Sequence, residues 1–346
     1  MGEKILTAQV MMVGGRRCGK TSILAAMKEN FEDLFSKTEL TLSIGDLDTL
    51  DVLEKKNNEI NDYFRGAANR TFTPDSNPTE ETMHYLFNVG IVGKESKIGV
   101  DFVDYPGEWL TDSEKKKELL DYMKKSQAII IAIDTPHMIE ENGRFNEYRN
   151  FCYRTSEMLK MAFEEANPAH MLVLFVPLKC ECYMAKEKME LVRERTEESY
   201  ESLIQYLQQH PKQYQVAVTP IFTMGGAAFS HFERDRQTME IAVDPVYHTP
   251  KKAIYCFPDV NVKKPEPKYC EQPIVWLMAY LLQLAGNEKA AQSRRAGLWK
   301  WVRIEVQDFM FSNAKAADYL KHKQVLLKNL KREKDGYHVV QNPMKF

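Results

Sequence analysis

The sequence lacks a hydrophobic run long enough to cross a membrane. Its most apolar stretch, residues 274–285, is interrupted by Gln283 and falls short of the roughly 20 residues that a spanning helix needs. The N-terminal residues show no basic-then-apolar signal pattern, and six cysteines are too few for a disulfide scaffold in a chain of 346 residues. These absences predict a reduced, cytoplasmic protein in which the apolar stretch is a core helix.

The chain also has no excess of charge of one sign, because 47 Lys and Arg residues accompany 49 Asp and Glu residues. This balance gives no electrostatic reason to expect nucleic acid or an anionic membrane as a partner, and no nucleic-acid-binding motif is present. The cysteines lack the C-x2-C spacing of structural zinc sites. With 44% hydrophobic and 28% charged residues, the composition is that of an ordinary globular protein.

Apolar runs of strand length alternate with segments of helical periodicity. Strands are expected at residues 5–13, 83–92, 98–103, 128–133, 171–178 and 215–223. Helices are expected to start at residue 21 and to span residues 113–125, 145–165, 185–209 and 272–284. This alternation predicts an α/β fold with a mostly parallel sheet and helices on both faces.

Three segments depart from the alternation. Residues 46–81 contain an expected helix, at 46–68, followed by a polar loop, and the proline-rich residues 227–267 contain one expected short strand at 253–257. Both are predicted to be insertions. Residues 287–346 carry 13 Lys and Arg against 6 Asp and Glu, with Trp299 and Trp301 near their start, and are predicted to form a separate basic extension. The extension could dock on the parent domain or present a surface to a partner.

The most specific motif follows the first expected strand. Residues 14–21 read Gly-Gly-Arg-Arg-Cys-Gly-Lys-Thr and match G-x-x-x-x-G-K-[ST] between a strand and a helix. The glycines let successive backbone N–H groups converge on a phosphate, and the following helix adds its positive end. Lys20 is expected to contact the β- and γ-phosphates, and the Thr21 hydroxyl to hold Mg²⁺. The predicted nucleotide-binding residues of this segment are Gly14, Gly15, Arg16, Arg17, Cys18, Gly19, Lys20, Thr21 and Ser22.

A second motif, D-x-x-G from Asp104 to Gly107, stands at the end of the strand expected at residues 98–103. An acidic residue at a strand end can hold a Mg²⁺-bound water, and the glycine N–H can contact the γ-phosphate. D-x-x-G is common in ordinary turns. Its place after an apolar strand, about 80 residues beyond the phosphate loop, favours the functional interpretation. Asp104 is therefore a predicted metal-site residue.

The phosphate loop followed by Asp104-Tyr105-Pro106-Gly107-Glu108-Trp109 resembles the TRAFAC-class GTPases. The string is particularly similar to the YcjX-like proteins and to the related double-GTPase proteins of bacterial conflict systems. The resemblance covers residues 4–286. It implies a three-layer, Ras-like P-loop NTPase domain at residues 1–286, a Mg²⁺-dependent switch between GTP and GDP, and a role in bacterial defence.

The resemblance also implies how the base is bound. In such proteins, the strand corresponding to residues 171–178 ends in N-K-x-D, whose carboxylate accepts hydrogen bonds from guanine while the lysine packs over the base. Here Lys179 and Glu181 keep the charges and the spacing, but Leu178 cannot make the hydrogen bonds of the asparagine. Lys179 and Glu181 are the predicted base contacts; the alternative is that they form a solvated strand end. The segment at residues 223–226 lies where the family places a second base-contacting loop.

Hydrolysis requires a positioned water and compensation of the charge that develops on the phosphates. Glu108 follows the D-x-x-G glycine, where Ras-type enzymes have glutamine, and its negative charge should be repelled by the γ-phosphate unless it is offset. Slow turnover is therefore expected. Arg16 or Arg17 could fold over the phosphates as an internal arginine finger, or could point to solvent. The predicted catalytic residues are Lys20, Glu108 and Arg16.

A threonine of the first switch should reach Mg²⁺ and the γ-phosphate. Thr71, Thr73 and Thr79 all lie in the polar loop before the strand at residues 83–92, and Thr73 is favoured. Two functions stay open. The first is a GTP-hydrolysing switch for a partner protein that binds through the switch loops or the C-terminal extension. The alternative is an ATP-binding or nucleotide-sensing assembly module with little turnover.

Overall fold

The computed structural model describes residues 6–35, 40–65, 71–74, 81–91, 98–259, 261–286 and 336–343. The described strands are β1 (Leu6–Val13), β2 (Leu40–Ile44), β3 (Thr71–Phe72), β4 (Met83–Ile91), β5 (Ile98–Asp104), β6 (Ala128–Asp134), β7 (Met171–Leu178), β8 (Tyr214–Val218), β9 (Ala228–Phe232), β10 (Ala253–Cys256) and β11 (His338–Gln341). The described α-helices are α1 (Lys20–Phe35), α2 (Leu47–Arg65), α3 (Lys116–Lys125), α4 (Thr135–Ile139), α5 (Asn146–Asn150), α6 (Cys152–Ala166), α7 (Lys186–Ser199), α8 (Glu201–Gln209) and α9 (Gln272–Gly286). Short 3-10 helices span Gly107–Leu110, Glu140–Gly143 and Glu181–Tyr183.

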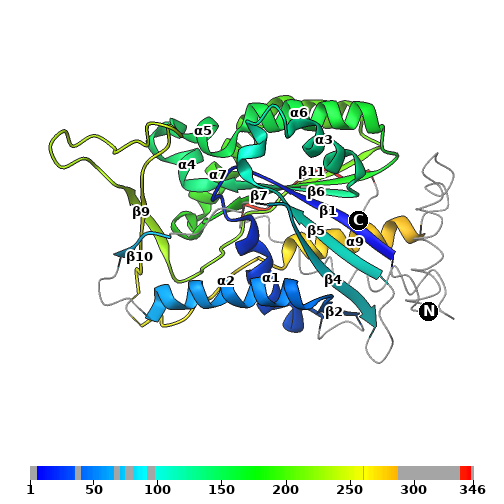
Figure 1. Ribbon diagram of the computed structural model, residues 1–346, viewed down its shortest axis with the longest axis horizontal. Coiled ribbons are helices and arrows are strands. Elements are labelled where there is room, and N and C mark those ends of the chain that lie inside the picture. The colour runs from blue at the N-terminus through cyan, green and yellow to red at the C-terminus, as the bar shows by residue number, and fades with distance from the viewer. Residues whose placement is uncertain are drawn as a thin grey trace.

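The elements form three layers, with a central sheet between two layers of helices (Figure 1). In Figure 1, α3 and α6 cover one face of the sheet, and α1, α2 and α9 cover the other. The alternating side chains of β1 account for this arrangement: Val10 and Met12 pack in the cluster that includes α1 and α9, whereas Met11 and Val13 pack in the cluster that includes α3 and α6. A strand buried on both faces reads as a continuous apolar run.

The central sheet has eight strands in the order β11-β8-β7-β6-β1-β5-β4-β2. The strands from β8 to β5 pair parallel with one another. Toward the two edges, β4 pairs antiparallel with β5, β2 with β4, and β11 with β8. This mostly parallel α/β sheet with helices on both faces is the predicted fold class. Because parallel strands end at the same edge, the loops that follow β1, β5, β6 and β7 meet there.

The strands predicted at residues 5–13, 83–92, 98–103, 128–133 and 171–178 are confirmed with ends that differ by at most one residue. The strand predicted at residues 215–223 is shorter, because β8 ends at Val218. Two predicted helices are each broken into two. Phe151, with φ of 50°, separates α5 from α6, and Tyr200 separates α7 from α8. The prediction of one helix over residues 145–165 is wrong. A single left-handed residue interrupts the helix, but the helical periodicity of the sequence continues across it.

Both predicted insertions pack beside the edge at which the parallel strands end. The helix expected at residues 46–68 is α2, and the strand expected at residues 253–257 is β10. The two insertions join in a small sheet of order β3-β10-β9. β3 lies within the predicted polar loop, and neither it nor β9 is long enough to give a clear alternating pattern. Residues 233–250 extend from the body of the protein at the left of Figure 1.

Part of the C-terminal extension contributes to the central sheet. β11 pairs antiparallel with β8 at the sheet edge, so residues 338–341 dock on the parent domain. Docking, one of the alternatives that the sequence leaves open for the extension, is therefore observed for this segment, in which the sequence indicates no strand. Trp299, Trp301 and the rest of residues 287–335 lie outside the described residues. The domain boundary at residue 286 stays a prediction.

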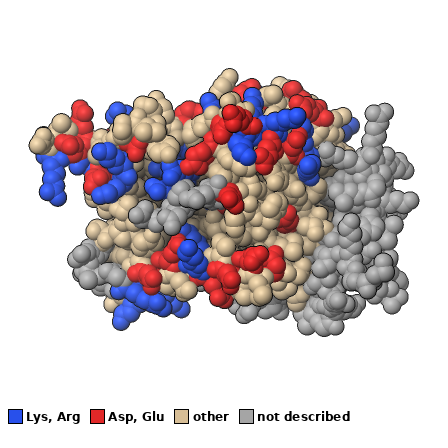
Figure 2. Space-filling view, in the orientation of Figure 1, with Lys and Arg blue, Asp and Glu red and all other residues tan. Residues whose placement is uncertain are grey.

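No helix of the described chain combines the length and the apolar character that crossing a bilayer requires. On the face shown in Figure 2, acidic and basic side chains are interspersed over the helices rather than gathered into a large patch of one sign. This distribution agrees with the balanced charge of the whole sequence.

Candidate functional site

The loop between β1 and α1 turns sharply and leaves little room for side chains. Gly19 has φ of 111° and Arg17 has φ of 58°, both in the left-handed region. A Cβ atom on Gly15 would lie 1.9 Å from the carbonyl oxygen of Arg149. The helix α1 begins at Lys20, directly after the turn. The strand, loop and helix that the motif predicts are therefore present in that order.

Lys20, Thr21 and Asp104 form one cluster, although Thr21 and Asp104 are 83 residues apart in the chain. Thr21 Oγ1 donates to Asp104 Oδ2 at 3.0 Å, and Lys20 Nζ lies 3.5 Å from Asp104 Oδ1. Lys20 Nζ also donates to the carbonyl oxygens of Gly14 at 3.1 Å and Gly15 at 3.4 Å. The two motifs are thus brought together at the sheet edge, with the Asp104 side chain fully buried.

The charge of Lys20 is stabilised by this arrangement. Burial alone would lower the pKa of Lys20, but the neighbouring Asp104 carboxylate outweighs burial and the pKa lies above its ordinary value. Lys20 therefore stays cationic at neutral pH. A buried ammonium that is held beside backbone N–H groups provides a site for an anion.

Gly107 lets the second motif approach the phosphate loop closely. A Cβ atom at this position would lie 2.2 Å from the backbone nitrogen of Arg16 and 2.5 Å from the carbonyl carbon of Gly15. The N–H of Gly14 donates to the buried hydroxyl of Tyr105 at 3.3 Å. The backbone after β5 is therefore seated directly on the phosphate loop, and a side chain at position 107 would separate the two.

Arg16 and Glu108 form an ion pair, with Arg16 Nε 2.8 Å from Glu108 Oε1. The Arg16 guanidinium also lies over the ring of Tyr247, at 4.8 Å from the ring centroid. The second carboxylate oxygen, Glu108 Oε2, is buried and has no hydrogen-bond partner among the described residues. Arg16 thus provides a positive charge that can offset the negative charge of Glu108, as the sequence analysis anticipates. Tyr247 belongs to the second insertion and was not predicted at the site.

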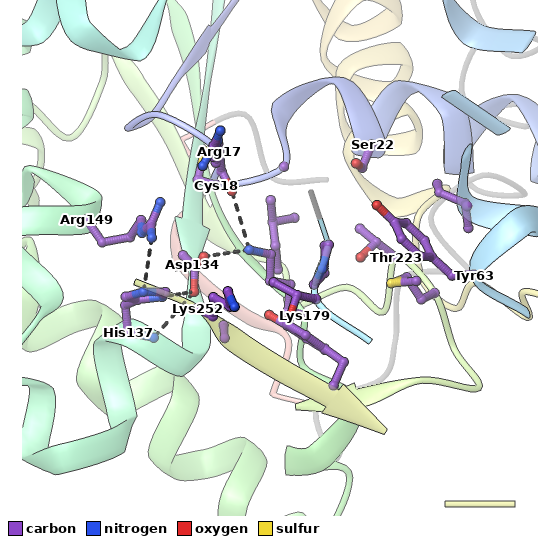
Figure 3. Close-up of a pocket in the computed structure, with 18 of the residues that line it drawn as sticks. Arg17, Cys18, Ser22, Tyr63, Asp134, His137, Arg149, Lys179, Thr223 and Lys252 are labelled. Carbon is purple, nitrogen blue, oxygen red and sulfur yellow. Dashed lines mark hydrogen bonds and ion pairs between the residues drawn. The ribbon is translucent and has the colours of Figure 1, made fainter. Parts of the chain in front are cut away.

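A first cavity, of about 430 Å³, opens beside the phosphate loop (Figure 3). Its walls come from the phosphate loop, α2, residues 73–74, the ends of β6 and β7, and residues 250–255. Ser22, Tyr63, Lys179, Thr223 and Lys252 are among the side chains around it in Figure 3. A cavity of this size, with aromatic and cationic walls, suits a small polar ligand with an aromatic part.

The predicted residues are distributed unevenly around this first cavity. Arg17, Cys18, Gly19, Lys179 and Thr73 line it. Thr71 instead lies in β3 and pairs with β10, and Thr79 lies outside the described residues. The assignment of Thr73 to the metal therefore stays a prediction.

Glu181 is buried and joins the two segments that the family resemblance assigns to the base. Its Oε1 accepts from the N–H groups of Met224 at 2.8 Å and Gly225 at 3.2 Å. Burial raises the pKa of Glu181 above its ordinary value, against the lowering effect of these two N–H groups. Glu181 is therefore not a solvated strand end, and it fixes the loop at residues 223–226 beside Lys179.

A buried charged network at the end of β6 was not predicted. Asp134 Oδ2 lies 2.6 Å from Lys179 Nζ, and Asp134 Oδ1 lies 2.6 Å from His137 Nδ1 (Figure 3). Arg149 contacts His137 Nε2 through Nη2 at 3.3 Å. Burial opposes the charge of Asp134, but His137, Lys179 and Arg149 outweigh it, so the pKa of Asp134 lies well below its ordinary value. The sequence signal that could have indicated Asp134 is the same as for Asp104, a carboxylate directly after an apolar strand.

A second cavity, also of about 430 Å³, lies next to the first and also reaches the phosphate loop. It is lined by Arg16, Glu108 and Tyr247, and it shares Arg17 and Arg149 with the first cavity. Both cavities thus adjoin the phosphate loop, the first beside Lys179 and the second beside Glu108. An elongated ligand on the phosphate loop could extend toward both.

The oxygen atoms near the loop suit a hard divalent cation. Thr21 Oγ1 and the carboxylate of Asp104 meet at 3.0 Å beside the phosphate loop. Mg²⁺ is commonly held by one or two protein oxygens together with phosphates and waters, not by an all-protein cage. Among the described residues there is no group of three or more His, Cys, Asp or Glu residues suited to a metal ion.

The profile of a protein family described as Double-GTPase 2 matches residues 9–228. No curated protein sequence matches significantly. Among solved structures, the LeoA bacterial dynamin GTPase from ETEC has a TM-score of 0.30 and 12% identity, covering 63% of this chain and 30% of that one. Sup35 complexed with GDP has a TM-score of 0.26 and 11% identity, covering 64% of this chain and 38% of that one. The chain therefore spans well under half the length of these two proteins.

Proposed function

The chain belongs to the Double-GTPase 2 family, and we propose that it binds a guanine nucleotide with Mg²⁺, hydrolyses GTP, and acts as a nucleotide-dependent switch for a partner protein. The observation that carries the proposal is the cluster of Lys20, Thr21 and Asp104. It joins the phosphate loop to the D-x-x-G motif through a hydrogen bond of 3.0 Å and a buried ion pair of 3.5 Å. Phosphoryl-transfer sites need both parts in one place.

The nucleotide would extend from the phosphate loop into the first cavity. Its phosphates would be held by the loop N–H groups and Lys20, and its base would lie between Lys179 and the loop that Glu181 fixes. Thr21 and Asp104 would hold Mg²⁺, with Thr73 as the proposed switch threonine. The ion would supply charge neutralisation of the phosphates.

The Arg16–Glu108 pair supports a specific arrangement for hydrolysis. A carboxylate beside the γ-phosphate is repelled by it, and the guanidinium at 2.8 Å offsets that charge. Glu108 would then orient the attacking water, while Arg16 compensates its charge and does not act as a free arginine finger. Because a glutamate needs this compensation and a glutamine does not, slow turnover is expected.

The contact of Gly107 with the phosphate loop supports a switch. With only hydrogen at this position, the backbone N–H can follow the γ-phosphate and withdraw after hydrolysis. The surface around Glu108 and Tyr247 would then change with the nucleotide, and a partner protein could recognise it. The role in bacterial conflict stays an expectation from the family resemblance.

The experiment that tests the proposal compares melting temperatures of the protein with GTP, GDP or ATP, each with Mg²⁺. A ligand that binds only the native state raises stability by about 2.7 kcal/mol at one hundred times its dissociation constant. Selective stabilisation by GTP and GDP is expected. Equal or greater stabilisation by ATP would decide for the ATP-binding alternative, and no stabilisation by any nucleotide at millimolar concentration would refute both.

A further inference from the structure

The phosphate loop has outward-facing carbonyl groups that need hydrogen-bond donors. When a loop turns its N–H groups inward toward an anion, some of its carbonyl oxygens face the surrounding protein. Two of them receive cationic donors. Arg149 Nη1 donates to the carbonyl oxygen of Arg16 at 3.0 Å, and Lys179 Nζ donates to that of Arg17 at 3.4 Å. The shape of the loop is thus supported from outside by two side chains distant in sequence.

Both of these cations are anchored to one carboxylate. Lys179 contacts Asp134 Oδ2 directly at 2.6 Å, and Arg149 reaches Asp134 Oδ1 through the ring of His137 (Figure 3). Asp134 is itself fixed, because its N–H donates to Asn150 Oδ1 at 2.8 Å and its carbonyl accepts from Asn150 Nδ2 at 3.2 Å. The side chains of Asp134 and His137 are 1% and 2% exposed, so the two members of this pair are almost fully shielded from water.

The protonation of His137 follows from its two neighbours. Arg149 carries only donors, so His137 Nε2 must accept, and the ring proton then lies on Nδ1 and donates to Asp134 Oδ1. The hydrogen bonds therefore run in one direction, from Arg149 through a neutral His137 to Asp134. Burial lowers the pKa of His137 to about 4; the Asp134 carboxylate opposes this shift, and Arg149 and Lys179 add to it, in agreement with a neutral ring.

We propose that Asp134 and His137 are positioning residues that hold Lys179 and Arg149 against the outer carbonyl groups of the phosphate loop, and so keep the loop in its anion-binding shape. Leu178, which stands where the family motif has asparagine, has no polar group for such a task. The proposal rests on the proposed nucleotide-binding function of the loop. It assigns a binding role to a network that would otherwise only contribute to folding stability.

The network also links the two ends of the site. Arg149 holds the backbone of Arg16, whose side chain pairs with Glu108, and Lys179 lines the first cavity. A side chain lost from the network should therefore weaken binding of the phosphate chain, whichever base is attached. If the ion pairs were merely structural, their loss would lower the melting temperature and leave the nucleotide affinity of the folded protein unchanged.

The test is a double-mutant cycle of GDP affinity, measured by calorimetry with Mg²⁺ on the full chain. Asp134→Asn and Arg149→Met are each expected to weaken binding by roughly tenfold to a hundredfold. The double variant should bind GDP no more weakly than whichever single variant has the lower affinity, because the two substitutions remove the same support from the loop. Asp101→Asn is the matched control: Asp101 accepts from His84 at 2.8 Å away from both cavities, and this variant should retain full affinity.

Effects that multiply, or single variants that bind as tightly as the parent, would overturn the proposal. If Asp134→Asn does not fold, the pair His137→Phe and His137→Gln replaces it. Phe removes both ring hydrogen bonds, whereas Gln offers one donor and one acceptor and should recover part of the affinity.

A spectroscopic measurement separates this proposal from the proposed function. Nitrogen-15 NMR of labelled histidine should show His137 as the neutral Nδ1–H form at pH 7, and Arg149→Met should perturb the Nε2 resonance. A parent protein that binds no purine nucleotide refutes the proposed function and the binding role of the network together. An Nε2–H form or a charged ring would overturn the network itself, even in a protein that binds GDP.

Discussion

At the phosphate end of the site, eight consecutive residues, 14–21, form the loop and the helix start, and only the D-x-x-G segment is added from elsewhere. At the base end, the walls of the first cavity come from α2, residues 73–74, the ends of β6 and β7, and residues 250–255. The phosphate end is thus nearly contiguous in sequence, whereas the proposed base end is assembled from separate segments, three of which lie in the two insertions.

The difference reflects the chemistry of the two ligand parts. A phosphate is recognised by backbone N–H groups and one ammonium, which a short loop can provide in a fixed pattern. A base needs a shaped pocket with a few polar groups, and many side-chain combinations can provide one. The proposed phosphate end therefore depends on one short motif, whereas the proposed base end depends on side chains from several elements.

The largest expected effect lies at the phosphate end. Lys20→Ala and Thr21→Ala should each weaken GTP binding by roughly a thousandfold, about 4 kcal/mol, because each removes a partner of the buried Asp104 and a proposed ligand contact. Titration calorimetry with Mg²⁺ measures this. The control is Lys28→Ala in the same helix, where Lys28 pairs only loosely with Glu54 at 3.9 Å. Unchanged GTP affinity in both loop variants would show that these residues do not bind the phosphates, and would refute the comparison between the two ends of the site.

The second effect concerns pH and the base end. The pKa of His137 is lowered to about 4 from an unfolded value of roughly 6.5. The unfolded chain therefore takes up a proton first as the pH falls. The stability associated with the neutral ring is complete above pH 6.5 and is lost toward pH 4. The loss should be on the order of 3 kcal/mol.

Chemical denaturation of the parent and of His137→Phe across this range measures the effect. The variant should show a flatter dependence of unfolding free energy on pH. Identical slopes in the two proteins would show that folding does not shift the pKa of His137, and the base end would then not depend on a ring that is held neutral. At the phosphate end, the raised pKa of Lys20 keeps its charge constant over the same range.

The third effect tests charge compensation beside the second cavity. Arg16→Met leaves Glu108 without its partner at 2.8 Å, and single-turnover GTP hydrolysis should slow by roughly thirtyfold, about 2 kcal/mol. Glu108→Gln added to Arg16→Met should recover part of the rate, because a neutral side chain needs no compensation. Arg193→Met, which removes a surface pair with Glu197, is the control. An unaltered rate in Glu108→Gln alone would remove that side chain from the mechanism.

The smallest expected effect is at Glu181. Glu181→Gln keeps an oxygen for the N–H groups of Met224 and Gly225 but loses the negative charge, so GTP affinity should fall by roughly fivefold and the preference for GTP over ATP should narrow. Burial raises the pKa of Glu181, so its charge is less favourable in the folded chain than in the unfolded chain, and loss of the charge should not decrease stability at pH 7. An unchanged nucleotide preference would separate Glu181 from base recognition.

The sequence predicted the parts of the site whose pattern is local. Gly14 to Thr21 form a contiguous motif, and Asp104 follows an apolar strand, so the sequence alone indicates both. Asp134 also follows an apolar strand, but no motif accompanies it, and a lone carboxylate is most often an ordinary strand end. Tyr247 and Arg149 carry no local signal at all, since their positions depend on how residues 233–250 and α5 pack.

The amino-acid sequence by itself determined the layered fold and the anion-binding loop, because hydrophobic periodicity and glycine spacing act over a few neighbouring residues. The tertiary structure alone decided that Arg16 faces Glu108, that Glu181 fixes the loop at residue 224, and that Asp134 connects Lys179 with His137 and Arg149. These contacts join residues far apart in the chain. Their geometry follows from the packing of whole elements at the sheet edge, which no local pattern encodes.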